Sequence, residues 1–330
     1  MIPLALLTGF LGSGKTSLLA RLLKSPGFAR TAVIINEFGE VALDHDLIAT
    51  SEESFITLQT GCLCCRAHDD LAATLEDLLL RRDGGVVQPF ERIVIETSGL
   101  ADPAPILHTV TGEDARLARL ELAGVLTTVD AINGLRTLAR HPEAVRQVAL
   151  ADRLILTKTD LLEGPASELG QCLHAINPRA RLLTAPDAEG DLERLFALGE
   201  RLREPDLAGA NAWPELERTA AHAGLATFAV VREEPLRAAV LTLLLEALAQ
   251  QCGQGLLRLK GIVNIVESPD RPAVVHAVQH LFHAPQWLDC WPSADRRTRL
   301  VFIVREVDAQ WVLALLRAIE IEVGEIADRG

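Results

Sequence analysis

Residues 9–16 read Gly9-Phe10-Leu11-Gly12-Ser13-Gly14-Lys15-Thr16 and fit the phosphate-loop pattern G-x-x-x-x-G-K-[ST]. Glycines in this pattern let backbone N–H groups turn inward around a pyrophosphate. The Lys15 ammonium is placed to reach the β- and γ-phosphate oxygens, and the Thr16 hydroxyl is placed to bind Mg²⁺. The pattern therefore predicts a nucleotide-binding loop. The residues expected to contact the nucleotide are Gly9, Gly12, Ser13, Gly14, Lys15, Thr16 and Ser17.

The sequence on both sides of the loop has the periodicity that this motif requires. Residues 2–7 form an apolar run typical of a buried parallel strand, and residues 16–24 have the pattern of a helix. Strands and helices alternate over roughly the first 200 residues, which predicts an α/β fold with a doubly wound parallel sheet. The other expected strands are residues 31–35, 93–95, 124–129 and 153–156, and further helices are expected at residues 69–82 and 143–149.

Composition changes at residues 204–211, a polar stretch that contains Pro205 and Gly209. We therefore expect a nucleotide-binding domain at residues 1–204, a linker at residues 205–222 and a second, smaller domain at residues 223–330. The second domain mixes strand-like and helical stretches, which predicts an α+β fold. Its expected strands are residues 226–232, 256–266, 273–279 and 299–305, and its expected helices are residues 235–251 and 309–319.

Chain length, net charge and cysteine spacing restrict the classes of protein to which this chain could belong. The 330 residues are enough for two domains with cores, and a net charge of −13 argues against a nucleic-acid partner. The opening apolar run ends at Leu7, far short of the roughly 20 residues that span a bilayer, so we expect no membrane segment and a cytoplasmic protein. Three of the six cysteines lie between Cys62 and Cys65, which indicates metal or redox chemistry rather than a disulfide scaffold.

A second motif, Thr157-Lys158-Thr159-Asp160, follows the expected strand at residues 153–156. A carboxylate at this place accepts hydrogen bonds from both the ring N–H and the exocyclic amine of guanine, a pair of donors that adenine lacks. An acceptor left unpaired by the wrong base discriminates by about 10⁴-fold. Asp160 therefore favours GTP over ATP, with Thr157 and Lys158 as further nucleotide contacts. The alternative is an ordinary surface turn.

A third motif is the apolar stretch 92–95 that ends in Glu96 and is followed by Gly99. An acid at such a strand end holds the Mg²⁺ shell, and a glycine beside the γ-phosphate senses hydrolysis through its N–H. We predict Lys15, Glu96 and Gly99 as the groups that act in hydrolysis, and Thr16 and Glu96 as magnesium ligands. The alternative is an acid that only caps the next helix.

The fourth motif is Gly61-Cys62-Leu63-Cys64-Cys65, just before a helix. Cys62, Cys64 and Cys65 offer two or three thiolates to one ion, and a helix N-terminus favours the thiolate form. Zn²⁺ is the expected ion, and Co²⁺ suits the same geometry. A tetrahedral site needs a fourth partner, for which water, another chain, Glu37 and Glu40 are candidates. A redox thiol pair and chance clustering are the alternatives.

Together these motifs resemble those of the CobW family of metal-chaperone GTPases, relatives of the hydrogenase and urease maturation GTPases. The matching segments are residues 8–16, 36–40, 61–65, 96–103 and 157–160, and residues 257–261 and 279–282 look like the family's C-terminal domain. The resemblance implies a P-loop GTPase that binds Zn²⁺ or a related ion through its C-x-C-C motif. It also implies delivery of that ion to a client metalloprotein or a cofactor pathway.

In this interpretation GTP and Mg²⁺ order residues 36–40 and 96–102, the cysteine loop then holds the metal, and hydrolysis releases it. No motif identifies an arginine finger, so a client or a second protomer is expected to supply one, and a homodimer is a candidate assembly. Two rival classes predict different behaviour. A P-loop kinase with a structural zinc site would prefer ATP, and a thiol-redox regulated nucleotide-binding protein would form a reversible disulfide in the C-x-C-C motif.

Overall fold

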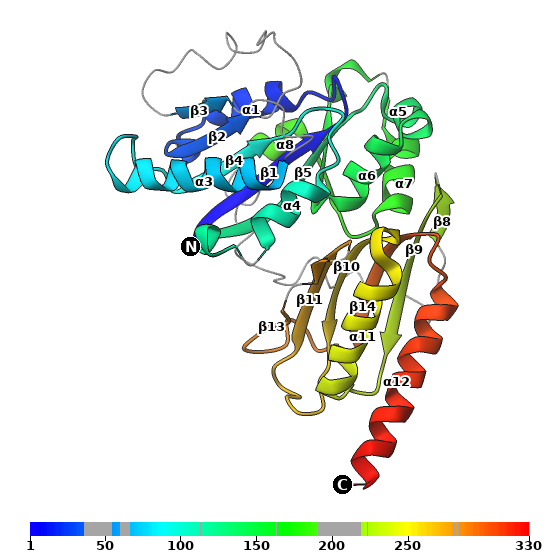
Figure 1. Cartoon of the computed structure of the whole chain (residues 1–330). Helices are drawn as coiled ribbons and strands as arrows, with labels where there is room; N and C mark the ends of the chain where they lie inside the picture. The colour runs from blue at the N-terminus through cyan, green and yellow to red at the C-terminus, as the bar shows by residue number, and fades with distance from the viewer. Residues whose placement is uncertain are drawn as a thin grey trace. The chain divides into compact units, whose positions relative to one another are not determined.

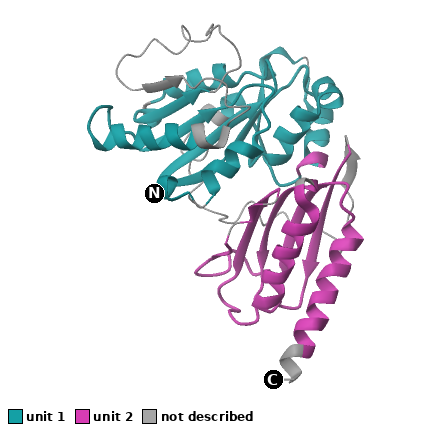
Figure 2. Cartoon of the chain, viewed as in Figure 1, with its two compact units in different colours: residues 1–174, 178–201 teal, residues 175–177, 202–330 magenta. Residues whose placement is uncertain are grey.

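The computed structural model describes residues 1–35, 55–59, 67–112, 114–162, 164–190, 219–222, 224–279, 281–282 and 284–329. The chain divides into two compact units, residues 1–174 with 178–201 and residues 175–177 with 202–330 (Figure 1; Figure 2). Each unit has its own sheet, parallel in the first and antiparallel in the second. The predicted fold class, an α/β domain followed by a smaller α+β domain, is therefore confirmed.

The first unit is built on seven parallel strands in the order β3-β2-β4-β1-β5-β6-β7. Because all of them run in one direction, their carboxyl ends meet at a single edge of the sheet, where ligands bind in such folds. The strands are β1 (Ile2–Gly9), β2 (Thr31–Ile35), β3 (Phe55–Gln59), β4 (Arg92–Glu96), β5 (Leu120–Asp130), β6 (Arg153–Thr157) and β7 (Arg181–Thr184).

Helices cover both faces of this sheet (Figure 1). The chain crosses the sheet in one direction from β1 to β2 and in the other from β4 through β5 to β6. Right-handed crossovers therefore place α1 on one face and α4, α5 and α6 on the opposite face. The helices are α1 (Lys15–Leu23), α3 (Ala67–Asp83), α4 (Ala104–Thr111), α5 (Gly134–Arg140), α6 (Pro142–Leu150), α7 (Ser167–Ile176) and α8 (Ala185–Gly190).

The central strand β1 explains why the opening run is continuously apolar. Its residues Leu4 to Leu7 are at most 1% exposed, because a central parallel strand is covered on both faces. Ala5 and Leu7 belong to one buried cluster with Leu18 and Leu22 of α1. This packing fixes α1 against the sheet and so fixes the loop that joins β1 to α1.

Several element boundaries differ from the sequence-based expectation. Strand β5 begins at Leu120 rather than at residue 124, because it pairs with β1 from Ile2 onward although Glu121 interrupts its apolar run. The short strands β3 and β7 were not predicted. Residues 205–218 of the predicted linker lie outside the described residues, whereas Thr219–His222 forms strand β8 and pairs with β9.

The second unit is an antiparallel sheet in the order β12-β11-β10-β14-β9-β8, with β13 paired to β11. Residues of helices α11 and α12 share one buried cluster with the sheet residues Phe228 and Phe302, whose rings stack with centroids 4.8 Å apart. The elements are β8 (Thr219–His222), β9 (Leu225–Arg232), α11 (Ala238–Cys252), β10 (Leu256–Val263), β11 (Ala273–Val278), β12 (Leu281–Phe282), β13 (Gln286–Trp287), β14 (Thr298–Arg305) and α12 (Ala309–Arg329).

Helix α12 continues ten residues beyond the predicted end at residue 319. Ile319 and Val323 pack against the core of the second unit, so the apolar stripe of the helix continues past the predicted end. In the part of the chain that the structure describes, no helix is long and apolar enough to cross a membrane.

Candidate functional site

The loop between β1 and α1 has the backbone shape that its glycines predict. Gly9, Gly12 and Gly14 have φ values of 144°, 70° and 84°, which residues with side chains rarely adopt. At Gly9 a Cβ atom would also lie 2.4 Å from Thr128 Oγ1 and 2.5 Å from the Thr128 carbonyl oxygen. The loop therefore lies directly against the end of β5, at the carboxyl edge of the sheet.

Two neighbouring strands anchor this loop through hydroxyl groups. Ser13 Oγ lies 2.7 Å from Thr128 Oγ1 of β5, and Thr157 Oγ1 of β6 donates to the Ser13 carbonyl at 2.7 Å. The hydroxyl of Ser13, a residue predicted to contact the nucleotide, thus points toward the sheet. The structure brings the phosphate-loop and Thr157 motifs together, although 144 residues separate Ser13 from Thr157.

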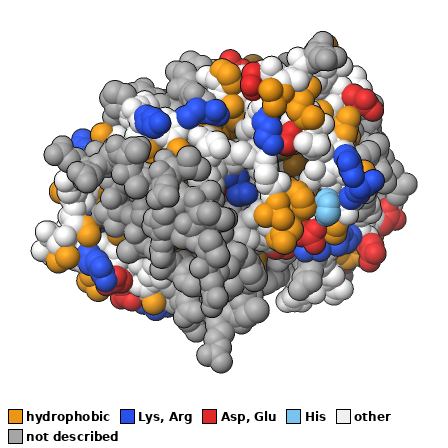
Figure 3. All heavy atoms as spheres, turned by 90° about the horizontal axis from the view of Figure 1, so that it is seen from above, with side chains coloured by type: hydrophobic (Ala, Val, Ile, Leu, Met, Phe, Trp, Pro, Cys, Tyr) orange, Lys and Arg blue, Asp and Glu red, His pale blue; other side chains and the backbone are white. Residues whose placement is uncertain are grey.

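Lys15 lies inside the loop and is only 8% exposed. Its ammonium donates to the carbonyl oxygens of Gly9 at 3.0 Å and Phe10 at 3.3 Å. These two hydrogen bonds hold the positive charge of Lys15 within the loop that the sequence predicts to bind phosphates. Ser17, in the first turn of α1, is exposed. Figure 3 looks onto this edge, where basic and hydrophobic side chains border a hollow.

The phosphate loop and the end of β4 are joined by a hydrogen bond from Thr16 Oγ1 to Glu96 Oε1, at 2.7 Å. The sheet register brings them together, because Leu7 of β1 pairs with Glu96. Glu96 is 4% exposed. A hydroxyl and a carboxylate oxygen are the hard ligands that Mg²⁺ prefers, so these two residues fit the ion that the sequence predicts there.

The segment after β4 also contacts the phosphate loop. A Cβ atom on Gly99 would lie 2.6 Å from the backbone nitrogen of Leu11, so only glycine fits between the two loops. Helix α6 holds this segment from the other side. Gln147 Nε2 donates to the carbonyl oxygens of Gly99 at 3.2 Å and Ala101 at 3.0 Å.

Sequence reasoning missed Gln147, as well as the neighbouring pair in which Arg146 Nη1 donates to Asp102 Oδ2 at 3.2 Å. Neither residue belongs to a local motif. The available indication was a glutamine on the otherwise apolar buried face of α6, where Gln147 is 0% exposed. Such a residue needs specific partners, which here are the backbone carbonyls of the segment predicted to sense hydrolysis.

The predicted base-reading turn has a distinctive backbone and one strong ion pair. Lys158 adopts a left-handed conformation with φ of 56°, and its Nζ lies 2.6 Å from Asp130 Oδ2 at the end of β5. Burial raises the pKa of Asp130, but the Lys158 ammonium and hydrogen bonds from Asn133 and the Ile132 backbone outweigh it. The pKa of Asp130 is therefore lowered. Asp160 is exposed in the short turn that follows.

The predicted metal residues Cys62, Cys64, Cys65, Glu37 and Glu40 lie outside the described residues. Within the described ranges, no group of three or more His, Cys, Asp or Glu side chains is arranged to hold a metal ion.

A phosphate loop after the first strand of a parallel sheet, with an acidic residue beside it at the end of β4, defines a P-loop nucleotide-binding protein. Comparison with family models makes this more specific. Residues 3–184 match the CobW/HypB/UreG nucleotide-binding domain, and residues 225–320 match the C-terminal domain of the cobalamin synthesis protein cobW. The chain belongs to the CobW family, within the wider CobW/HypB/UreG group.

Individual relatives resemble the chain over nearly its whole length. It is 35% identical over 303 residues to the zinc chaperone YjiA of Escherichia coli (strain K12), covering 92% of this chain and 93% of YjiA. It is 31% identical over 360 residues to the zinc chaperone CobW of Sinorhizobium sp, covering 96% and 97%. The crystal structure of the Zn(II)-bound YjiA GTPase from E. coli superposes with a TM-score of 0.72 at 28% identity, covering 96% of this chain and 98% of that one.

The lowered pKa of Asp130 gives a pH-dependent prediction. The folded state stabilises the carboxylate form, so this contribution is present at neutral pH and is lost as pH falls below about 4, through the lowered pKa. Asp130→Asn should reduce the unfolding free energy at pH 7 by about 1–3 kcal/mol. Denaturant titrations of both proteins should show this difference shrinking toward pH 3; a difference that stays constant would contradict the assignment.

Proposed function

We propose that this protein is a GTPase that binds Zn²⁺ and delivers it to a client metalloprotein or a metal-cofactor pathway. The observation that carries the proposal is the hydrogen bond between Thr16 and Glu96. It joins the loop that would hold the phosphates to the segment that would sense the γ-phosphate. The relatives support the metal part, since two are named zinc chaperones and the matching crystal structure is described as a Zn(II)-bound GTPase.

Each group at the carboxyl edge has a distinct task in the proposed hydrolysis. The Lys15 ammonium, now bonded to loop carbonyls, would exchange those bonds for the β- and γ-phosphate oxygens. Thr16 and Glu96 would hold Mg²⁺, which when bound neutralises charge on the phosphates. The N–H of Gly99 would face the γ-phosphate, and Asp160 would accept from guanine. The glycine geometry of the loop is already built, so binding requires little rearrangement.

The sheet supports placing the metal segments beside this site. Ile35, the last residue of β2, pairs with Glu96 on one side and with Gln59, the last residue of β3, on the other. Glu37 and Cys62 follow these two strand ends by two and three residues. Strands β2 and β3 therefore both end at the edge where Glu96 lies, and this favours a metal site that responds to the state of the nucleotide.

The proposed metal site consists of Cys62, Cys64 and Cys65, with Glu37 or Glu40 as the fourth ligand. Zn²⁺ is preferred over Co²⁺ because the relatives are named for zinc. The cytoplasm is the compartment we assign, because thiols persist in the reduced form there. A homodimer or the client would supply the group that speeds hydrolysis.

Asp160→Asn tests guanine recognition. Because the asparagine amide presents a donor where guanine also presents one, the variant should bind GTP about 10²–10⁴-fold more weakly and discriminate less against ATP. Asp77→Asn, an exposed residue of α3 paired with Arg81, is the matched control and should leave both affinities unchanged. Fluorescent-nucleotide competition measures both. Unchanged GTP selectivity in Asp160→Asn would refute the role of Asp160 in reading the base, and a preference of the wild type for ATP would favour the P-loop kinase.

Replacing Cys62, Cys64 and Cys65 together by serine tests the metal site. Serine hydroxyls stay protonated at neutral pH, so tight Zn²⁺ binding to the reduced protein, measured with a competing chelator, should be lost. The matched control replaces the other three cysteines, Cys172, Cys252 and Cys290. It should bind as the wild type does. A triple variant that retains wild-type affinity would refute the C-x-C-C site, and a reversible disulfide without metal binding would favour the redox alternative.

A further inference from the structure

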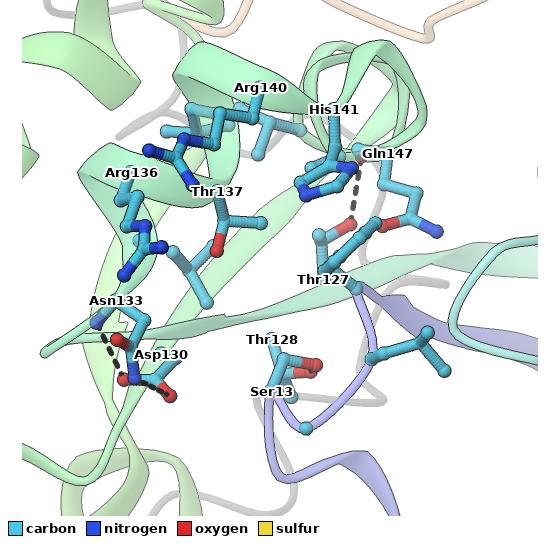
Figure 4. Close-up of a pocket in the computed structure, with 18 of the residues that line it drawn as sticks. Ser13, Thr127, Thr128, Asp130, Asn133, Arg136, Thr137, Arg140, His141 and Gln147 are labelled. Carbon is cyan, nitrogen blue, oxygen red and sulfur yellow. Dashed lines mark hydrogen bonds between the residues drawn. The ribbon is translucent and has the colours of Figure 1, made fainter.

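A cavity of about 380 Å³ lies on the side of the phosphate loop away from α1 (Figure 4). One wall is the loop from Phe10 to Ser13, and the floor is the end of β5. Thr127 Oγ1 donates to the Gln147 carbonyl of α6 at 3.0 Å, whereas the neighbouring residue Leu126 packs in the cluster that contains α1. The cavity therefore opens toward the face of the sheet that α5 and α6 cover.

The lining of this cavity is positively charged in a chain whose net charge is −13. Arg136 and Arg140, one helical turn apart on α5, both line it. Neither guanidinium forms an ion pair with any residue that the structure describes. Lys158 also lines the cavity, but it is paired with Asp130, the one acidic residue of the lining. Two like charges four residues apart on a helix repel each other, and a bound anion would relieve this repulsion.

A buried acceptor lies at the inner end of the cavity. Gln147 is 0% exposed, and its Nε2 donates to two backbone carbonyls of the segment after β4. Its Oε1 accepts no hydrogen bond from the described residues. Exchanging the two amide atoms would set the oxygen against both carbonyls, so the orientation is fixed. A buried acceptor of this kind calls for a donor, which a ligand hydroxyl or N–H would provide.

We propose that this cavity is a second ligand site, for a small oxyanion that also carries a hydroxyl group. Arg136 and Arg140 bind the oxyanion, and Gln147 accepts from the hydroxyl. The imidazole of His141 packs against Phe10 with ring centroids 4.4 Å apart and ring planes inclined by 30°, and it lies between the two ends (Figure 4). The volume suits a small metabolite rather than a macromolecule. Hydroxycarboxylates and phosphate esters of polyols both have this chemistry.

The site is mechanically linked to the nucleotide. Gln147 lines the cavity, and its Nε2 donates to the carbonyls of Gly99 and Ala101. Arg146, the preceding residue of α6, pairs with Asp102 in the same segment. A ligand that changes the position of Gln147 therefore changes the segment that the γ-phosphate would order, and by linkage the nucleotide changes the affinity for the ligand.

Calorimetric titration of the GDP-loaded protein in metal-free buffer tests the proposal, because GDP fills the phosphate loop. The probes are citrate against tricarballylate, and glycerol 3-phosphate against propyl phosphate; within each pair only the hydroxyl groups are lost. At least one hydroxylated probe should bind with 1:1 stoichiometry and about tenfold or more tighter than its partner. The pair that shows this identifies a carboxylate or a phosphate ligand.

Variants assign the binding to the cavity. Arg136→Gln with Arg140→Gln should weaken the bound probe by about tenfold or more, whereas Arg81→Gln on α3, outside the cavity, should not. Both cavity arginines are exposed, so unchanged GDP affinity and melting temperature are expected, and the single variants replace the double one if it fails to fold. The proposal is overturned if no probe saturates at millimolar concentration, if the arginine variants bind as tightly as the wild type, or if GDP abolishes binding seen in the nucleotide-free protein.

Discussion

The hydrogen bond between Thr16 and Glu96 is the contact on which the proposed function depends. It forms because β1 and β4 are adjacent parallel strands whose carboxyl ends meet in register, with Leu7 opposite Glu96. Around it, Gly99 fits against the backbone of Leu11 at a distance that leaves no room for a side chain. The phosphate loop and the segment after β4 are thereby in direct contact, so in the proposed mechanism a change at bound phosphates would be transmitted directly to that segment.

The phosphate loop has a different environment on each side. On one side the loop joins β1 and α1, whose apolar residues share one buried cluster. Among the described residues, Lys15 is the only buried cation of the loop. Toward α5 and α6 the loop borders a polar cavity with two arginines. Gln147 connects this second environment to the carbonyls of Gly99 and Ala101. Helix α6 is therefore the element through which events on one side of the loop would reach the other.

The sequence predicted the parallel sheet and the loop well, because buried central strands are continuous apolar runs and the phosphate motif is local. It also placed Thr16 near Glu96 and Thr157 near the loop, since carboxyl ends of parallel strands share an edge. It did not predict Gln147, Arg146 or the cavity. The hydrogen-bond partners of Gln147 and Arg146 lie about 40 to 50 residues away and are mostly backbone carbonyls, which leave no pattern in the sequence. The full length of α12 was missed because its end depends on packing against the second sheet.

The central claim is that the nucleotide controls metal binding, and one comparison tests it most directly. Zn²⁺ affinity of the wild-type reduced protein would be measured by chelator competition, once with Mg²⁺ and a non-hydrolysable GTP analogue and once with Mg²⁺ and GDP. Our account predicts binding about tenfold or more tighter in the GTP-analogue state, within the usual range of coupling between two sites. Equal affinity in the two states would contradict nucleotide-controlled delivery and leave a GTPase whose metal site does not respond to hydrolysis.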